Sequence, residues 1–344
     1  MSQIKFSIVI TTYNRIALLK RAINTALSQT ISCEVVVIDD YSTDDTETYV
    51  KSLIETLQKK QDTRLVYHRN EQNQGHAKTV NIGVEKAGVD WIKLVDDDDY
   101  LAPNCIEEIE KAIALHPQAV ICSFQAAQVD ENEVELTITR KSGPGEVFYV
   151  PQEDIHYGML LEMIPFGTPI QVAFEKAAFI KSGGWDSSLD TNFDDADSWL
   201  KISQFGDAIF INKCLGYRTL WLRAYNYKFS IEDRCNTNML IKEKIYKLVA
   251  EKYRNQIPSL PEINDYLKLH WGLVAMRQGK IFNAMKLVLP AIFSQTAWYL
   301  ILTRSKNTPY PEEINTKNYV KIQLTVPEEY SLKEIQYSGS TRCD

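Results

Sequence analysis

The sequence has little of several features that would place it in a special class of proteins. Its six cysteines include no CxxC pair and no tight cluster with histidine, which argues against a zinc site or a redox dithiol, so we expect reduced thiols. Glycine (14) and proline (12) are too rare for a collagen-like or low-complexity chain. Basic residues are not in excess. The net charge of −7 argues against a nucleic-acid partner held through its phosphates.

Signals for export and membrane insertion are also missing. Residues 1–6 lead into an apolar strand pattern without the basic and long hydrophobic regions of a signal peptide, so we expect a cytoplasmic protein. No window offers the roughly 18 uninterrupted apolar residues of a transmembrane helix. The apolar stretch 281–303 has two interpretations. It forms either two short helices packed in a core and broken at Pro290, or a peripheral contact with the inner face of the membrane. We favour the packed helices.

The residues that are present indicate a globular α/β protein. The 344 residues are 44% hydrophobic and 24% charged, and their number is enough for about two domains. Within the first hundred residues, short β-branched runs alternate with helical spacing, which is typical of βα units and a parallel sheet. We predict a mixed, mostly parallel sheet flanked by helices over residues 1–220. Residues 221–344 are predicted to form a mainly helical extension with a polar tail. Its aromatic side chains Trp221, Tyr266 and Trp271 are predicted to lie in a core or to stack on a ligand.

The elements can be placed along the chain from the same periodicity. Strands are predicted at 6–11, 35–38, 65–67, 91–95, 120–126 and 147–150, with one edge strand at 319–326; helices are predicted at 18–27, 50–57, 76–86 and 104–116. Asn14 is a candidate N-cap of the first helix, and Ser42 with Asp45 resembles a capping box for the second. Right-handed crossovers would bring the strand ends Thr12, Asp39 and Asp96 to one edge of the sheet, where open α/β sheets bind ligands.

Four consecutive aspartates, Asp96 to Asp99, follow the apolar strand that ends at Val95. Adjacent carboxylates repel one another, and their ionised forms need a compensating charge. Oxygen ligands favour Mg²⁺ or Mn²⁺, bound through one or two carboxylates together with substrate phosphates. The alternative is a solvated acidic turn. We favour the cation because the run lies at the ligand-binding edge.

Several segments together resemble the successive motifs of family 2 glycosyltransferases with the GT-A fold, a Rossmann-type α/β fold. The motifs read SIVITTYNR at 7–15, VIDDYSTD at 37–44, NQG at 73–75 with NIG at 81–83, and DDDD at 96–99. Their order and spacing match over about residues 6–215. The resemblance implies an inverting, metal-dependent transfer of sugar from a nucleotide diphosphate sugar, in the first instance a UDP-sugar, to a hydroxyl acceptor in glycan or polysaccharide assembly. The acceptor would be a glycan, a lipid-linked glycan or a protein. Residues 1–100 would be the nucleotide-binding half and residues 101–220 the acceptor-side half.

The resemblance also implies roles for particular residues. The first strand end and the aspartate pair after the second strand would hold the base and ribose, with Asp39 accepting the imide N–H of uracil. The DxD pattern falls on Asp96 and Asp98, with Asp98 the first choice for Mn²⁺ or Mg²⁺. Alternatively, Asp39 and Asp40 only begin a turn and cap the next helix. The predicted donor-binding residues are Thr11, Thr12, Tyr13, Arg15, Asp39, Asp40, Asn73, Gly75, Lys78, Asp96 and Asp97.

The chain departs from the family pattern at two places. Tyr41 stands where the family often has glycine, and Val80 stands where it often has arginine. The second change removes an expected ion pair near the donor. Lys78 or His76 is a candidate to replace it, although for His76 we favour an ordinary exposed position at the helix start.

A second acidic cluster, Asp194, Asp195 and Asp197, follows Gly183–Gly184 at the start of a predicted helix. It resembles the family motif that carries the catalytic base, and the alignment favours Asp195. Such a base accepts the proton of the acceptor hydroxyl while that oxygen attacks the anomeric carbon. Charge alone leaves all three aspartates open. The alternative is capping, because carboxylates favour the N-terminal end of a helix.

Two other functions remain open from the sequence. A nucleotidyltransferase would also use a metal-binding carboxylate cluster, although the chain has no GxxxxGK[ST] phosphate loop. The other possibility is a non-catalytic module that binds nucleotide sugars or glycans on the same scaffold. The departures at Tyr41 and Val80 are the reason to consider such a module.

Overall fold

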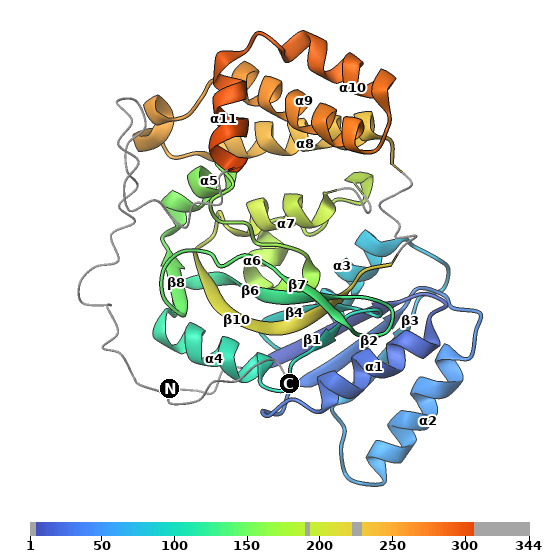
Figure 1. Ribbon diagram of the computed structural model, residues 1–344. Coiled ribbons are helices and arrows are strands. Elements are labelled where there is room, and N and C mark those ends of the chain that lie inside the picture. Colours follow the sequence, from blue (N-terminus) through green and yellow to red (C-terminus); the bar gives the residue numbers. More distant parts are fainter. Residues whose placement is uncertain (1–4, 190–192, 222–228, 306–344) are drawn as a thin grey trace.

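The computed structural model describes residues 5–189, 193–221 and 229–305, which form a large mixed sheet with helices on both faces and a helical unit beside it (Figure 1). In these residues the strand order is β3-β2-β1-β4-β9-β6-β10-β5, with β7 paired to β6 and β8 paired to β10. The strands are β1 (Phe6–Thr12), β2 (Glu34–Asp39), β3 (Leu65–Arg69), β4 (Trp91–Asp96), β5 (Tyr100–Leu101), β6 (Ala119–Val129), β7 (Glu135–Ile138), β8 (Val147–Val150), β9 (Val172–Glu175) and β10 (Asp207–Thr219). This architecture confirms the predicted mixed α/β fold.

Strands β1 to β4 form a wholly parallel half whose side chains alternate between two cores. Ile8 and Ile10 of β1 pack against α1 (Ile16–Leu27) and α2 (Thr46–Gln58), whereas Val9 packs against α3 (His76–Lys86) on the opposite face. All seven residues of β1 are buried. Both faces of the strand are covered, which fits its central apolar run of Ile8, Val9 and Ile10 without polar alternation.

The carboxyl ends of these strands meet at one edge of the sheet, as the crossover rule predicts. In the register of β1, Thr11 lies opposite Asp96 of β4 and Thr12 lies opposite Asp39 of β2. The polar residues that end three separate strands are therefore neighbours. This edge carries the candidate site.

Two of the predicted helix caps are wrong. Helix α1 has Arg15 at its N-cap position, and Asn14 has a φ of 54° and accepts the backbone N–H of Thr43 at 2.7 Å. Helix α2 begins only at Thr46, and the Ser42 hydroxyl accepts the N–H of Asn14 at 2.9 Å. Both side chains bond across to the other loop instead of capping their own helix. They therefore hold the β1–α1 and β2–α2 loops together beside the site.

The second half of the sheet extends the first by antiparallel and parallel pairing. Strand β9 pairs antiparallel with β4 and β6, and β6 pairs parallel with β10. Gly183 and Gly184, with φ of 86° and 71°, end α6 and lead the chain toward α7. The helices here are α4 (Cys105–Leu115), α5 (Gln152–Leu160), α6 (Lys176–Lys181) and α7 (Asp194–Ile202), with 3₁₀ turns η1 (Pro169–Gln171) and η2 (Ser187–Leu189).

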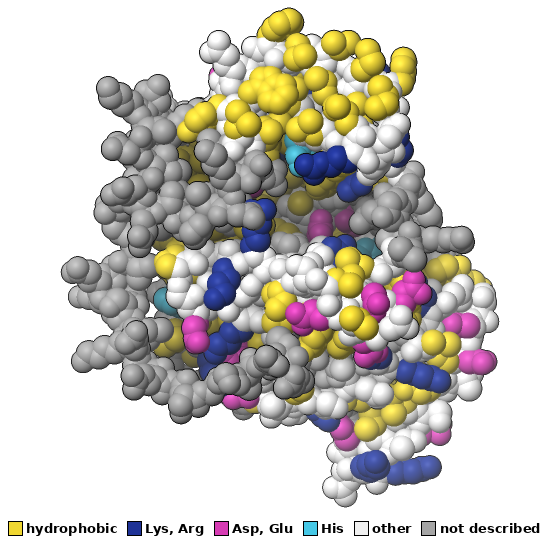
Figure 2. Space-filling view, in the orientation of Figure 1, with side chains coloured by type: hydrophobic (Ala, Val, Ile, Leu, Met, Phe, Trp, Pro, Cys, Tyr) yellow, Lys and Arg dark blue, Asp and Glu magenta, His cyan; other side chains and the backbone are white. Residues whose placement is uncertain are grey.

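The C-terminal helices form a unit with its own apolar core, against α5 and α7. Tyr266 and Trp271 lie in this core, and Leu200 of α7 joins it. Figure 2 shows hydrophobic side chains also gathered over the outer surface of this unit. In the described part of the chain, no helix is both long and apolar enough to cross a membrane. The unit consists of α8 (Ile231–Leu248), η4 (Glu251–Gln256), α9 (Leu260–Arg277), α10 (Ile281–Val288), η5 (Leu289–Ala291) and α11 (Gln295–Ser305).

The break between α10 and α11 falls at Pro290, as predicted, and both helices pack partly on α9. The predicted edge strand at 319–326 lies outside the described residues. The five cysteines that the structure describes are all free thiols.

Candidate active site

The acidic run turns away from the sheet directly after β4, and its side chains alternate in exposure. The N–H of Asp99 bonds to the carbonyl of Asp96 at 3.0 Å, which closes a tight turn before β5. Asp97 and Asp99 are each only 4% exposed. The side chains of Asp96 and Asp98 are 31% and 17% exposed. The two positions of the DxD pattern are therefore the more accessible ones.

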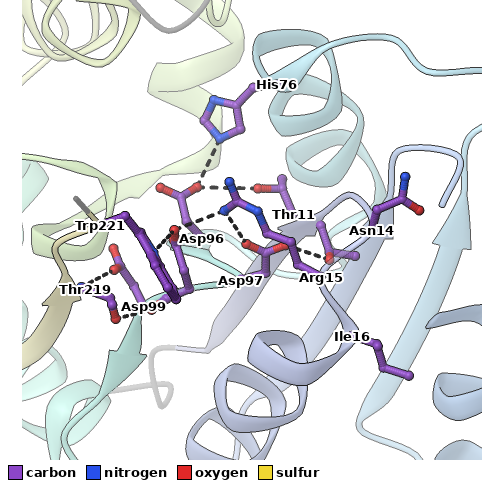
Figure 3. Close-up of polar contacts among 12 residues, drawn as sticks. Thr11, Asn14, Arg15, Ile16, His76, Asp96, Asp97, Asp99, Thr219 and Trp221 are labelled. Atoms are coloured by element: carbon purple, nitrogen blue, oxygen red, sulfur yellow. Dashed lines mark hydrogen bonds and ion pairs between the residues drawn. The ribbon is translucent and has the colours of Figure 1, made fainter. Parts of the chain in front are cut away.

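The two buried aspartates fasten the turn to neighbouring strands. Asp97 accepts a hydrogen bond from the Thr12 hydroxyl at 2.8 Å, and Asp99 accepts the backbone N–H of Thr219 at 2.9 Å (Figure 3). Burial raises the pKa of Asp97 to about 7, against the opposing charge of Arg15. Burial and the nearby Asp98 carboxylate also raise the pKa of Asp99. These two carboxylates hold the loop in place.

Asp98 lies between an arginine and a tryptophan. Arg15 donates to Asp98 at 3.0 Å and also contacts Asp97 at 3.2 Å, so this predicted donor-binding residue does reach the acidic run. The indole N–H of Trp221 donates to Asp98 at 3.0 Å, which places Trp221 at the site instead of in a core. Burial and repulsion from Asp96 raise the pKa of Asp98.

His76 connects the acidic run to the second acidic cluster. Its Nε2 lies 3.0 Å from Asp96 (Figure 3). Its Nδ1 lies 3.8 Å from Asp194. Burial disfavours the imidazolium, but the carboxylates of Asp96 and Asp194 outweigh it and raise the pKa of His76 well above its usual value. The expectation of an exposed position at the helix start is therefore wrong. Gly75 is the N-cap, and His76, as the first residue of α3, reaches the end of β4.

The three aspartates at the start of α7 have different surroundings. Asp197 is fully buried between the ammonium groups of Lys201 at 2.8 Å and Lys244 of α8 at 2.5 Å. Asp194 is buried beside His76. Asp195 is partly buried and accepts the N–H of Ala196 at 2.7 Å. Burial, followed by the charge of Asp194, raises the pKa of Asp195 to about 7.

Arg218, near the end of β10, is a site residue that the sequence analysis missed. Burial opposes ionisation of Asp96, but the charges of His76 and then Arg218 lower its pKa below the usual value. The same guanidinium partly offsets the raised pKa of Asp195. Arg218 therefore lies close to both acidic groups. The only sequence signal is a basic residue in a largely buried strand, directly before Thr219.

Asp39 and Asp40 are placed differently from the acidic run, because both carboxylates accept hydrogen bonds from neighbouring segments of the chain. Asp39 is 0% exposed and accepts the N–H of Ser42 at 2.8 Å and the hydroxyl of Tyr67 at 2.6 Å. Asp40 accepts the N–H groups of Gln74 at 2.7 Å and Gly75 at 3.0 Å. The bond from Ser42 fits the alternative that the pair begins a turn, but neither aspartate caps α2, whose N-cap position is occupied by Asp45. The predicted contact of Asp39 with a base stays a prediction.

The remaining predicted donor-binding residues surround this edge. Thr11 is buried with its hydroxyl 3.5 Å from Asp96, and the ring of Tyr13 is exposed. Asn73 donates to the carbonyl of Asp40 at 3.3 Å. Lys78 is exposed on α3. The structure thus brings Thr11, Thr12 and Arg15 to the acidic run, whereas Asn73 and Gly75 bond to the Asp40 loop.

Solved glycosyltransferases have a similar fold. S. aureus TarS 1–349, solved in complex with UDP-GlcNAc, superposes with a TM-score of 0.56 at 18% identity, covering 83% of this chain and 90% of that one. The mannosyltransferase PcManGT from Pyrobaculum calidifontis, solved with GDP-Man and Mn²⁺, gives a TM-score of 0.52 at 18% identity, covering 88% and 79%. At this identity the likeness shows the fold alone.

The sequence identifies the family. Residues 7–183 match the family described as "Glycosyl transferase family 2", and the chain belongs to this family. It is 30% identical over 199 residues to an uncharacterized glycosyltransferase of Haemophilus influenzae, which covers 58% of this chain and 62% of that one. The chain spans about half to three fifths of the length of such curated relatives.

Proposed function

We propose that the protein transfers a sugar from a nucleotide diphosphate sugar, in the first instance a UDP-sugar, to a hydroxyl group of an acceptor, with inversion at the anomeric carbon. The observation that carries this proposal is the placement of His76 between Asp96 of β4 and Asp194 of α7, at 3.0 and 3.8 Å. This placement brings two groups into one site. One is a carboxylate suited to the diphosphate end of a donor, and the other is an acidic cluster suited to proton transfer.

The donor would bind over the ends of β1 and β2, in residues 1–100, and the acceptor would bind against residues 101–220. Arg15 has a side chain that is 47% exposed at this edge, so it can turn from Asp98 toward a phosphate. The exposed ring of Tyr13 offers a surface for the base or ribose. Of the two proteins of similar fold, TarS was solved with UDP-GlcNAc and PcManGT with GDP-Man, so both kinds of donor are to be tested.

A divalent cation fits the acidic run. Among the described residues, no three histidine, cysteine, aspartate or glutamate side chains are gathered so as to hold a metal by themselves. However, Asp96 and Asp98 are the more accessible pair of the acidic run, and Mg²⁺ commonly binds one or two carboxylates and completes its shell with substrate phosphates. Burial, followed by repulsion from Asp96, raises the pKa of Asp98, so a bound cation would favour its ionised form. We assign Mn²⁺ or Mg²⁺ to this pair, where it would stabilise negative charge on the departing diphosphate.

Helix α7 provides the residue that takes the proton from the acceptor. The acceptor oxygen attacks the anomeric carbon, the bond from that carbon to the diphosphate oxygen breaks, and the hydroxyl proton passes to Asp195. A base that titrates near 7 is matched to work at neutral pH. Asp197 is engaged by Lys201 and Lys244, and Asp194 lies against His76, so Asp195 is the best placed of the three.

The acceptor in this proposal is a glycan, a lipid-linked glycan or a protein, and the reaction belongs to glycan or polysaccharide assembly in the cytoplasm. Family membership supports the class of reaction. The test is to incubate the protein with UDP- and GDP-sugars, a panel of such acceptors, and Mn²⁺, Mg²⁺ or a chelator. Metal-dependent release of nucleoside diphosphate with a glycosylated product is the expected result. Release of pyrophosphate would instead indicate a nucleotidyltransferase, and donor binding without any release would indicate a binding module.

A further inference from the structure

Helix α10 is apolar on both of its sides. Its inner side packs on α9 through the buried side chains of Ala284 and Leu287. Its outer side carries Ile281, Phe282 and Met285, which are exposed. A helix that serves only to complete a core would be polar on its outer side. The outer side of α10 therefore needs another explanation.

The exposed apolar surface continues beyond α10 onto neighbouring elements. Phe282 and Phe293, at 82% and 92% exposed, are the most exposed large hydrophobic side chains in the described part of the chain. Figure 2 shows hydrophobic side chains gathered over this end of the molecule. Large apolar patches on soluble proteins mark interaction sites. We call this surface the outer face; its residues are Met276, Ile281, Phe282, Met285, Leu289, Ile292, Phe293, Tyr299 and Leu302.

The charge of the same segment is opposite to that of the whole protein. Residues 266–305 contain five lysines and arginines and no aspartate or glutamate, whereas the chain has a net charge of −7. Arg277 and Lys280 are exposed at the turn from α9 to α10. Lys286 of α10 is exposed as well and pairs with Glu232 of α8 at 2.7 Å. Basic groups thus border the outer face.

We propose that the outer face docks on an anionic lipid surface. Exposed phenylalanines beside lysine and arginine are the combination that inserts into the headgroup region of a bilayer and is attracted to anionic lipids. A second copy of the chain is disfavoured as the occupant, because a symmetric contact would bring two basic faces together. The proposal concerns where the protein sits and not the reaction, since vesicle binding requires neither donor nor acceptor.

The experiment is sedimentation of the full chain with vesicles of phosphatidylcholine alone or mixed with phosphatidylglycerol, at low and high salt. The wild type should bind the anionic vesicles, and less so at high salt. The double variant Phe282→Ser with Phe293→Ser should bind about a hundredfold more weakly or worse, because each inserted ring contributes about tenfold or more. Ile180→Ser is the matched control, since Ile180 is 61% exposed on α6, away from the outer face. It should bind as the wild type does.

A charge variant tests the electrostatic part separately. Arg277→Glu with Lys280→Glu should weaken binding to anionic vesicles by about fivefold or more for each basic residue lost and reduce the salt dependence. All variants should keep the melting temperature of the wild type, because the changed side chains are exposed. If the double phenylalanine variant fails to fold, the charge variant decides.

Three results would overturn the proposal. These are a wild type that does not bind anionic vesicles, variants of the outer face that bind as strongly as the wild type, or a wild-type dimer in sedimentation analysis that the phenylalanine substitutions dissociate. The last result would make a second copy the occupant. Donor binding measured by calorimetry on the same samples is independent of all three, so a failed docking surface is distinguishable from a failed transferase.

Discussion

Replacing Asp195 with asparagine should separate catalysis from binding and stability. The bond that the structure gives Asp195 is from the N–H of Ala196 at 2.7 Å, and an asparagine side-chain oxygen can accept the same bond. Asparagine is also about as favourable as aspartate near a helix N-terminus. We therefore expect the melting temperature and the affinity for UDP to stay near wild type. Transfer should fall about 10²- to 10⁴-fold, the usual contribution of a positioned general base.

The pH dependence gives this prediction a second readout. Because burial and Asp194 raise the pKa of Asp195 to about 7, the carboxylate needed as a base is lost as the pH falls through 7. Wild-type kcat/KM should drop about tenfold per pH unit well below that value. In Asp195→Asn this acidic limb should vanish. The assay is nucleoside diphosphate release between pH 5.5 and 8.5, within about a unit and a half of that pKa. Transfer within a fewfold of wild type, or an unchanged acidic limb, would refute the reasoning.

The other predictions test neighbouring groups. Asp197→Asn should lower the free energy of unfolding by about 2 kcal/mol in a denaturant titration. The substitution replaces a buried carboxylate, which is paired with two partly exposed lysines, by a neutral amide. An unchanged unfolding midpoint would argue against a contribution of these ion pairs to stability. Asp98→Asn should abolish the Mn²⁺ dependence of UDP binding in calorimetry, and wild-type behaviour would remove Asp98 from the metal site. Asp39→Ala should weaken UDP binding about ten- to a hundredfold if the carboxylate contacts the base. If UDP affinity is unchanged and only the melting temperature falls, Asp39 only orders its loop through Ser42 and Tyr67.

The fold was predictable from the sequence because its signals are local and repeated. β-branched runs such as residues 6–11, followed by helical spacing, indicate βα units wherever they occur. The position of Asp96 at the ligand edge followed from the same pattern, since parallel strands end together. The cap predictions at Asn14 and Ser42 failed for a physical reason. Each side chain accepts a hydrogen bond from a backbone N–H of the other loop, 28 or 29 residues away, instead of one at the start of its own helix.

The parts of the site that the sequence did not reveal depend on contacts between distant segments. His76 acquires its role only because α7 brings Asp194 to within 3.8 Å. Trp221 bonds to Asp98, and the charge of Arg218 lowers the pKa of Asp96, because β10 returns along the sheet more than a hundred residues later. Neither carries a motif of its own. No periodicity or local spacing encodes such neighbours.

The alternating exposure of the acidic run limits how the β4–β5 connection can change in length. Asp97 and Asp99 bind Thr12 and the backbone of Thr219, while the side chains of Asp96 and Asp98 are more accessible. Because all four residues are aspartate, a shift of the segment by one residue would leave aspartate at three of the four places. An insertion of one residue within β4 would put Val95 at the place of Asp96, beside His76, and a deletion would put Tyr100 at the place of Asp99, beside the backbone of Thr219. A change of one residue in length would therefore remove either an accessible carboxylate or an anchoring one, although the sequence would still contain four aspartates in a row.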